Sequence, residues 1–230
     1  MEYKNRIADK LLRDKLEAMG AVLIEGPKAC GKTTTAEQQA KSIIYMDDPV
    51  KQEQYKQMAQ TNIRFLLEGE TPRLIDEWQH VPQFWDAIRF EVDHRDDDGQ
   101  FMLTGSAVPA DMKEIHHTGT GRYGWLTMRP MSLWESGEST GEVSLSDLFL
   151  TPDRIGALNK LTLPMLAFAA CRGGWPKSLQ KKTEKAALSQ VTEYYKAITN
   201  SDISRVDNVK RDEERAKRIM RSYARHQGSL

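Results

Sequence analysis

Cysteine is scarce in this 230-residue chain, which has only Cys30 and Cys171. They lie far apart and lack the short spacing of zinc ligands, so the sequence predicts neither a disulfide framework nor a zinc site. The adjacent His116 and His117 would point in different directions on a strand or a helix and would chelate a metal poorly. The polar run from residue 93 to 98 lacks the spacing of a calcium loop and is better explained as a solvated turn. None of these groups predicts a metal site.

Charge of one sign and long apolar runs are also missing. The chain has 33 lysine and arginine residues and 33 aspartate and glutamate residues. No global field therefore draws it toward nucleic acid or a membrane, and any such affinity must be local. No window reaches the roughly 18 apolar residues of a membrane span, and no apolar signal core follows the first six residues. We therefore expect a cytoplasmic protein, and its 39% of apolar residues are enough for a packed core.

One stretch carries a specific chemical signal. Residues 26 to 33 match the G-x-x-x-x-G-K-[ST] phosphate-binding loop, and they follow the apolar run from Ala21 to Ile24. The two glycines let the backbone curl so that N–H groups face one concavity, and the helix expected from about Lys32 adds its positive dipole end. The expected nucleotide-binding residues are Gly26, Pro27, Lys28, Ala29, Cys30, Gly31, Lys32, Thr33 and Thr34.

Two side chains of this loop have separate expected tasks. The Lys32 ammonium should reach the β- and γ-phosphates of ATP, and the Thr33 hydroxyl should complete the shell of a Mg²⁺ ion held by phosphate oxygens. Cys30 is expected to be a small filler of the loop. A glycine-rich turn without a ligand is the alternative, and the next motif weighs against it.

A second apolar strand, from Arg73 to Ile75, ends in two acids, Asp76 and Glu77. This is the pattern of a Walker B segment. It predicts that Asp76 lies beside the Mg²⁺ shell and that Glu77 polarises a water molecule against the γ-phosphate. The alternative is a strand that ends in a solvated Asp-Glu turn.

A third predicted strand, from Phe101 to Leu103, is followed by Thr104, Gly105 and Ser106. A hydroxyl at the tip of a strand beside the phosphate strand can contact the γ-phosphate or orient the attacking water, which is the role called sensor 1. Thr104 is the first candidate and Ser106 the second. An ordinary Thr-Gly-Ser turn is the alternative.

Arg122 suggests a contact with another molecule. Arg122 stands in a glycine-rich segment before a predicted strand at 125–128, where its guanidinium could reach a phosphate bound by a neighbouring subunit; this predicts a homo-oligomer in the ATP-bound state. Pairing with a local acid fits Arg122 equally well.

A group of five arginines recurs every three or four residues near the end of the sequence and consists of Arg211, Arg215, Arg218, Arg221 and Arg225. Such a stripe can bind nucleic-acid phosphates, although a solvated helix face is the commoner explanation.

Apolar periodicity predicts the remaining organisation. A helix should precede Gly20, a short strand should cover 43–46, and a short helix should run from Pro109 to Ile115. One helix is expected over residues 51–68, with Tyr55, Met58, Phe65 and Leu66 buried; the helix begun by Pro82 should bury Phe84, Trp85, Ile88 and Val92. The expected fold is α/β, with a parallel-sheet core at 1–135, a linker at 136–147 and a smaller all-helical unit at 148–230.

Several of these segments occur together in one protein family. They comprise Gly-Pro-Lys-Ala-Cys-Gly-Lys-Thr-Thr-Thr from residue 26, Asp-Glu-Trp-Gln from 76, Leu-Thr-Gly-Ser from 103, Gly-Arg from 121 and Gly-Gly-Trp-Pro from 173. In this combination the chain resembles a prokaryotic family of AAA-type ATPases that carry a trailing domain of unknown function. After about residue 202 the sequence resembles only the opening helices of that trailing domain, so we expect an incomplete one here.

The resemblance implies a P-loop fold of the additional-strand, catalytic-glutamate type. It also implies residue roles: phosphate lysine for Lys32, magnesium ligands for Thr33 and Asp76, catalytic glutamate for Glu77, sensor 1 for Thr104 and arginine finger for Arg122.

Three other functions compete with an ATPase that uses hydrolysis to change the conformation of a partner or oligomer. A P-loop kinase has less need of the paired Asp76 and Glu77, because an acceptor replaces water, and the core shows no second arginine-rich lid. A GTPase would need Asn-Lys-x-Asp, whereas Asn159-Lys160 is followed by Leu161 and Thr162. A nucleotide-gated nucleic-acid-binding module remains the non-enzyme alternative.

Overall fold

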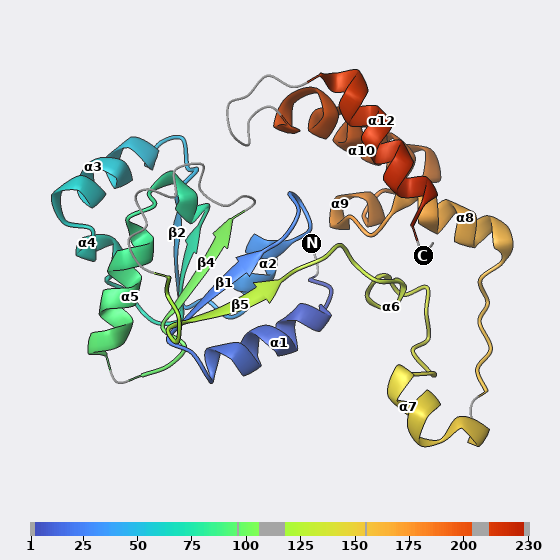
Figure 1. Cartoon of the computed structure of the whole chain (residues 1–230), viewed down its shortest axis with the longest axis horizontal. Helices are drawn as coiled ribbons and strands as arrows, with labels where there is room; N and C mark the ends of the chain where they lie inside the picture. The colour runs from blue at the N-terminus through green and yellow to red at the C-terminus, as the bar shows by residue number, and fades with distance from the viewer. Residues whose placement is uncertain (1–2, 96, 106–117, 155, 204–211, 228–230) are drawn as a thin grey trace.

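The computed structural model describes residues 3–95, 97–105, 118–154, 156–203 and 212–227. Its centre is a five-stranded parallel sheet in the order β2-β3-β4-β1-β5 (Figure 1). The strands are β1 (Ala21–Glu25), β2 (Ser42–Tyr45), β3 (Arg73–Asp76), β4 (Phe101–Gly105) and β5 (Tyr123–Thr127). Because β4 lies between β1 and β3, the expected additional-strand arrangement is confirmed.

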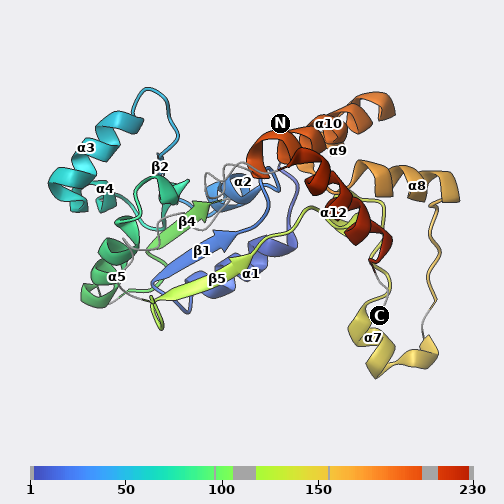
Figure 2. The same ribbon diagram turned by 45° about the horizontal axis from the view of Figure 1, so that its top comes forward.

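Helices cover both faces of the sheet, as expected for a parallel sheet. On one face, α1 (Ile7–Leu16) and α2 (Lys32–Glu37) pack on the alternate β1 residues Val22 and Ile24. On the other face, α4 (Arg64–Leu67) and α5 (Phe84–His94) pack on Ala21 and Leu23. Figure 2 shows the sheet between these two layers. Successive side chains of β1 point to opposite faces, and both faces are covered by helices. The sequence of β1 is therefore apolar at every position from Ala21 to Ile24 instead of alternating between apolar and polar residues.

The prediction of a single helix over residues 51–68 is wrong. The segment forms α3 (Gln52–Asn62) and α4, with a break at Ile63. Tyr55 and Met58 pack partly buried against the core, as predicted. Phe65 is 53% exposed, whereas Leu66 and Leu67 are buried. The break changes which side of the last turn faces the sheet, and a continuous 3.6-residue period could not anticipate it.

The expected apolar face of the helix after Pro82 is largely confirmed. A short 3₁₀ turn, η1 (Trp78–His80), precedes α5. Phe84, Trp85 and Ile88 are buried, and Val92 packs partly buried on the same cluster. These aromatic rings are therefore part of the core that supports the end of β3.

After β5 the described residues form helices and the loops between them, which confirms the expected helical C-terminal portion. Its elements are α6 (Leu133–Ser136), α7 (Leu145–Leu150), η3 (Pro152–Arg154), α8 (Leu163–Arg172), α9 (Pro176–Leu179), α10 (Glu184–Ala197), η4 (Ile198–Asp202) and α12 (Glu213–Arg225). Helix α7 crosses the predicted boundary between linker and helical unit at residue 148. Within the described residues, no helix is long and apolar enough to cross a membrane.

Some sequence predictions lie outside the described residues. They are the helix from Pro109 to Ile115, the pair His116 and His117, the second sensor candidate Ser106, and Arg211 of the basic stripe.

Candidate nucleotide-binding site

The phosphate-binding loop joins β1 to α2 in an unusual backbone conformation. Gly26 has φ 154° and Gly31 has φ 104°, and Ala29 also has a positive φ of 62°. A Cβ atom at Gly26 would lie 2.1 Å from the carbonyl oxygen of Met128, so only glycine fits there. Cys30 is fully buried under the loop with Leu12 and Met128, which confirms its expected role as a filler. Burial raises the pKa of its thiol.

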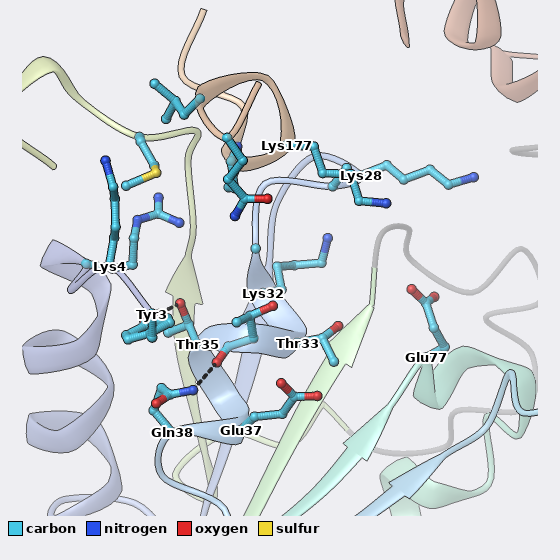
Figure 3. Close-up of a pocket in the computed structure, with 18 residues that line it drawn as sticks. Tyr3, Lys4, Lys28, Lys32, Thr33, Thr35, Glu37, Gln38, Glu77 and Lys177 are labelled. Carbon is cyan, nitrogen blue, oxygen red and sulfur yellow. Dashed lines mark hydrogen bonds between the residues drawn. The ribbon is translucent and has the colours of Figure 1, made fainter. Parts of the chain in front are cut away.

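Lys32 begins α2 and points its ammonium group back over the loop. Its Nζ donates hydrogen bonds to the carbonyl oxygens of Gly26 (2.9 Å) and Pro27 (3.1 Å), and the residue is 6% exposed. A pocket of ≈ 720 Å³ opens above it (Figure 3). Lys4, Lys28 and Lys177 also line this pocket. Such a concave, cation-rich site at a glycine-rich loop suits a polyphosphate.

Asp76 is the point where the three predicted motifs meet. The sheet register pairs Asp76 with Thr104, and it pairs Thr104 with Ile24 at the end of β1. Thr33 Oγ1 donates to Asp76 Oδ1 at 2.7 Å, and Thr104 Oγ1 donates to the same oxygen. The structure thus brings Thr33, Asp76 and Thr104 together, although they are separated by tens of residues in the sequence.

The environment of Asp76 is unfavourable for a bare carboxylate. Burial raises its pKa, and the two hydroxyl donors from Thr104 and Thr33 oppose this effect without cancelling it. The neighbouring Glu77 adds a further raising contribution through its negative charge. A buried carboxylate of this kind gains most from a nearby cation.

The donor set fits a magnesium ion that is bound mainly through a nucleotide. In the described part of the chain, no group of three His, Cys, Asp or Glu side chains could hold a metal. Thr33 and Asp76 supply one hydroxyl and one carboxylate, which are oxygen donors of the kind Mg²⁺ prefers. Mg²⁺ usually binds proteins through one or two such groups together with substrate phosphates and water.

Glu77 is held in a strained conformation directly after β3. Its backbone lies in the left-handed region at φ 52° and ψ 44°, which is costly for a residue with a Cβ. Its side chain lines the pocket and points upward in Figure 3, on the same side of the sheet edge as Lys32. Gln79 Nε2 donates to Glu77 Oε2. This partner was not predicted from the sequence, although Gln79 stands within the segment that carries the family resemblance.

Gln79 is itself tightly confined. Its Oε1 is buried and has no hydrogen-bond partner among the described residues. A Cβ added at Gly105 would lie 2.5 Å from that atom, so the glycine after Thr104 leaves room for the amide. The turn after β3 and the tip of β4 therefore fix the Gln79 amide, which in turn holds the Glu77 carboxylate.

The helical unit reaches the phosphate-binding loop through its Gly-Gly-Trp-Pro segment. A Cβ at Gly174 would lie 2.0 Å from the carbonyl oxygen of Met131, and Met131 N donates to Gly174 O at 2.7 Å. Trp175 packs against the cluster that contains Cys30, and Pro176 lines the pocket. In the sequence this segment stood out only as part of the family resemblance, and its contact with the loop became visible in the structure.

A second contact from the helical unit involves Lys28. The Tyr194 hydroxyl in α10 donates to Lys28 O at 2.9 Å, and Asp202 in η4 pairs with Lys28 Nζ at 3.6 Å. The rings of Tyr194 and Trp175 lie 4.4 Å apart. Burial raises the pKa of Tyr194 to about 12. Two elements that lie far along the chain, α10 and η4, therefore contact the phosphate-binding loop.

Arg122 lies away from the pocket of its own chain. It directly precedes β5, whereas the phosphate-binding loop follows β1, which runs parallel to β5, so a strand length of roughly 17 Å separates the two positions. Its Nε donates to Asp93 Oδ1 at 2.7 Å, and the side chain is 43% exposed. The structure thus shows the local ion pair that was one of the two sequence-based explanations. It does not bring Arg122 to the site.

Comparisons with known proteins agree with this geometry. Residues 19–136 match the family model described as an AAA domain, and residues 164–230 match a domain of unknown function. No curated protein matches the chain in sequence. Among solved structures, the Walker-type ATPase of Pyrococcus abyssi has a TM-score of 0.51 at 13% identity, over 90% of this chain and 76% of that one.

Two further solved structures give lower similarity. PCH-2 of C. elegans has a TM-score of 0.40 at 15% identity, over 81% of this chain and 67% of that one. AMPPCP-bound DnaA from Aquifex aeolicus has a TM-score of 0.41 at 13% identity, over 99% of this chain and 90% of that one. At these identities, likeness to solved structures concerns the fold, whereas the family model covers more than half of the sequence. This chain belongs to the AAA domain family.

Proposed function

We propose that this protein binds ATP with Mg²⁺, hydrolyses it, and couples hydrolysis to a conformational change in a partner or oligomer. The observation that carries the proposal is the meeting of Thr33 and Thr104 on one oxygen of Asp76, beside the loop that holds Lys32. An AAA-type fold with this set of groups suggests ATP binding and hydrolysis.

Each group has a defined task in this proposal. Lys32 leaves its two carbonyl acceptors and binds the β- and γ-phosphates. Thr33 and Asp76 would hold Mg²⁺, which when bound neutralises phosphate charge that develops during the reaction. Glu77 accepts a proton from the attacking water, and Thr104 orients that water or contacts the γ-phosphate.

Gln79 is a positioning residue, because it acts through Glu77. Its amide holds the carboxylate on the pocket side of a strained turn. We expect Gln79→Leu to lower kcat about tenfold and to leave KM within about twofold, since only the orientation of the base is lost. In a Glu77→Gln background the same change should have no further effect. A general loss of folding would instead lower both parameters and add to the Glu77→Gln effect.

The contacts at Lys28 provide a route for coupling. Tyr194 and Asp202 bind the backbone and the side chain of a residue that belongs to the phosphate-binding loop. A triphosphate that draws Lys28 toward itself would compete with Asp202 for the ammonium group. Nucleotide binding would thereby loosen or shift α10 and η4 relative to the sheet.

The proposal is tested by ATP binding and phosphate release with Mg²⁺ present. Lys32→Ala should weaken ATP binding by two orders of magnitude or more, because it removes the cation aimed at the phosphates. Glu77→Gln should bind ATP normally and lose about 10²–10⁴-fold in turnover. Lys41→Ala changes an exposed lysine and serves as the control. Equal loss of ATP affinity in the Lys32 and Glu77 variants would contradict these roles.

We further propose that Arg122 acts on ATP bound by a neighbouring subunit, because its position before β5 lies far from its own loop. Removing an arginine finger typically costs about 10³–10⁵ in kcat. Arg122→Ala and Lys32→Ala proteins, each inactive alone, should recover activity when mixed and co-assembled. If such mixtures stay inactive while size measurements show that they assemble, the role in trans is wrong.

A further inference from the structure

The last helix presents an arginine face that the nucleotide site does not use. In α12, Asp212 caps the N-terminus by accepting from the N–H groups of Glu214 and Arg215. The helix carries five basic and two acidic side chains. Four of the basic residues are exposed, namely Arg215, Arg218, Arg221 and Arg225, which we call the arginine face.

In the described part of the chain, the arginine face makes no direct pair with an acid, although the charge of Glu214 attracts Arg221. No hydrogen bond or ion pair joins its four guanidinium groups to another described side chain. The nearby Glu214 is already paired with Lys217 at 2.9 Å. Like charges three and four residues apart destabilise a helix when nothing neutralises them. A solvated face would more commonly alternate acids with bases, which this face does not do.

The opposite side of α12 is attached to the rest of the chain. Ala216 is 4% exposed and Met220 is half-buried, and Thr199 of the neighbouring η4 is fully buried. A helix that lies in a membrane surface must bury its apolar side in lipid. Here Ala216 and Met220 on that side are covered while Ile219 and Tyr223 are exposed, and the basic side faces outward at all four arginines.

We propose that the arginine face binds the phosphodiester backbone of nucleic acid without reading its sequence. At 1.5 Å per residue, the four arginines span about 15 Å along the helix, a length over which duplex DNA carries about nine phosphate charges. Guanidinium groups pair with phosphate oxygens in a bidentate manner, which favours arginine over lysine at such a surface. Because the chain as a whole has no net charge, this attraction is local.

The test is the anisotropy of a labelled duplex of about 30 base pairs, titrated with the full chain at several salt concentrations. We expect the logarithm of affinity to fall with the logarithm of salt concentration with a slope of about −3 to −4, since four contacts contribute roughly 0.9 each. Changing all four arginines to glutamine should reduce affinity at least tenfold and bring the slope near zero. Changing all four to lysine should keep most of the slope, because the charge is retained.

A charge-matched control keeps the test specific. Lys10, Arg13, Lys41 and Lys51 are also exposed, and changing these four to glutamine removes the same charge. This control should bind DNA within about twofold of the parent chain. Circular dichroism and thermal melting show whether the arginine-face variants remain folded. Lys32→Ala should bind the duplex normally, which separates this surface from ATP binding.

Three results would overturn the proposal. One is the absence of duplex binding by the parent chain at about 50 mM salt, where backbone contacts are strong. Another is equal binding by the arginine-face glutamine variant and the charge-matched control. The third is arginine-dependent binding to phosphatidylserine vesicles without any binding to the duplex, which would assign the face to a membrane surface.

Discussion

The sheet core and the helical unit of this protein are held in place by different forces. In the core, the strands and their covering helices bury two apolar clusters with side chains as large as Phe84, Phe101 and Leu103. Among the described residues after Ser136, the buried apolar residues are the three alanines Ala169, Ala187 and Ala216. The same region exposes several large apolar side chains, among them Leu145, Phe149, Leu150, Leu158 and Leu163.

The helical unit is instead attached by the packing of one side chain, Trp175, on the cluster that contains Cys30, and otherwise by polar and backbone contacts. Met131 N donates to Gly174 O at 2.7 Å, and inside the unit Arg172 pairs with Glu138 at 2.6 Å. Tyr194 and Asp202 bind Lys28 of the phosphate-binding loop. Burial of apolar area gives a core one rigid arrangement, whereas a few polar contacts are individually weak and can be replaced by other polar partners. The difference teaches that the helical unit is the weakly attached part, which is the part that the proposed coupling to a nucleotide would move.

The largest expected effect comes from truncating side chains in the two regions. Leu103→Ala removes a fully buried side chain from the central strand β4 and should lower the free energy of unfolding by about 4 kcal/mol. Phe149→Ala removes a larger side chain that is 81% exposed and should change that free energy by less than about 0.5 kcal/mol. Denaturant unfolding measures both. Comparable losses would show that the helical unit packs as a true core.

The second prediction concerns the ion pair between the N-terminal segment and α6. Arg6 and Glu135 lie 2.9 Å apart, and each side chain is 5% exposed. Burial acts to raise the pKa of Glu135, but the N–H groups of Ser132 and Ile7 together with Arg6 outweigh it and lower the pKa. Glu135→Gln leaves Arg6 buried without its counter-ion and should cost about 3 kcal/mol at neutral pH.

The pH dependence of this effect has a defined sign. A carboxylate whose pKa is lowered by folding contributes stability above its ordinary pKa of 4.5, and the contribution is lost as the pH falls through the lowered value. The difference between parent and Glu135→Gln protein should therefore be constant near neutral pH and shrink below about pH 4.5. A constant difference down to pH 3 would contradict the assignment.

The third prediction tests the attachment of α10. Tyr194→Phe removes the hydrogen bond to Lys28 O and should lower the free energy of local opening by about 1 kcal/mol. Because the pKa of Tyr194 is raised to about 12, the hydroxyl keeps its proton and this contribution persists through neutral pH; it is lost only as the pH rises through that value. Hydrogen exchange of α10 amides should quicken about fivefold. Tyr223→Phe, at a 78% exposed tyrosine, should leave exchange unchanged.

The smallest effect is expected at the Lys28–Asp202 pair. Its atoms are 3.6 Å apart, and the Lys28 side chain is 62% exposed, so salt and water screen the attraction. Asp202→Asn should change the free energy of local opening, measured by hydrogen exchange of the α10 amides, by less than about 0.5 kcal/mol. This change should vanish in high salt. A large, salt-independent effect would mean that this pair, rather than Tyr194, attaches the helical unit.

Much of the core could be predicted because its signals are local. The strands β1, β3 and β4 are short apolar runs, and the motifs that follow them predicted that Thr33, Asp76 and Thr104 belong to one site; the structure brings these three side chains together. The break at Ile63 and the exposure of Phe65 could not be predicted, because periodicity shows which residues can share a face and not where a helix stops. The hydrogen bond from Gln79 to Glu77 was not predicted either, since it depends on the strained turn at Glu77.

The sequence by itself determined the phosphate-binding loop, the acids after β3 and the basic stripe, because spacing along one chain segment is enough to define each. The tertiary structure decided the rest: β4 lies between β1 and β3, Gly174 and Trp175 pack beside the loop, Lys28 is bound from α10 and η4, and Arg122 is paired with Asp93. These are contacts between groups that lie far apart in the sequence, 166 residues for Tyr194 and Lys28. Contacts at that separation are chosen by close packing and hydrogen-bond geometry, which no local pattern encodes.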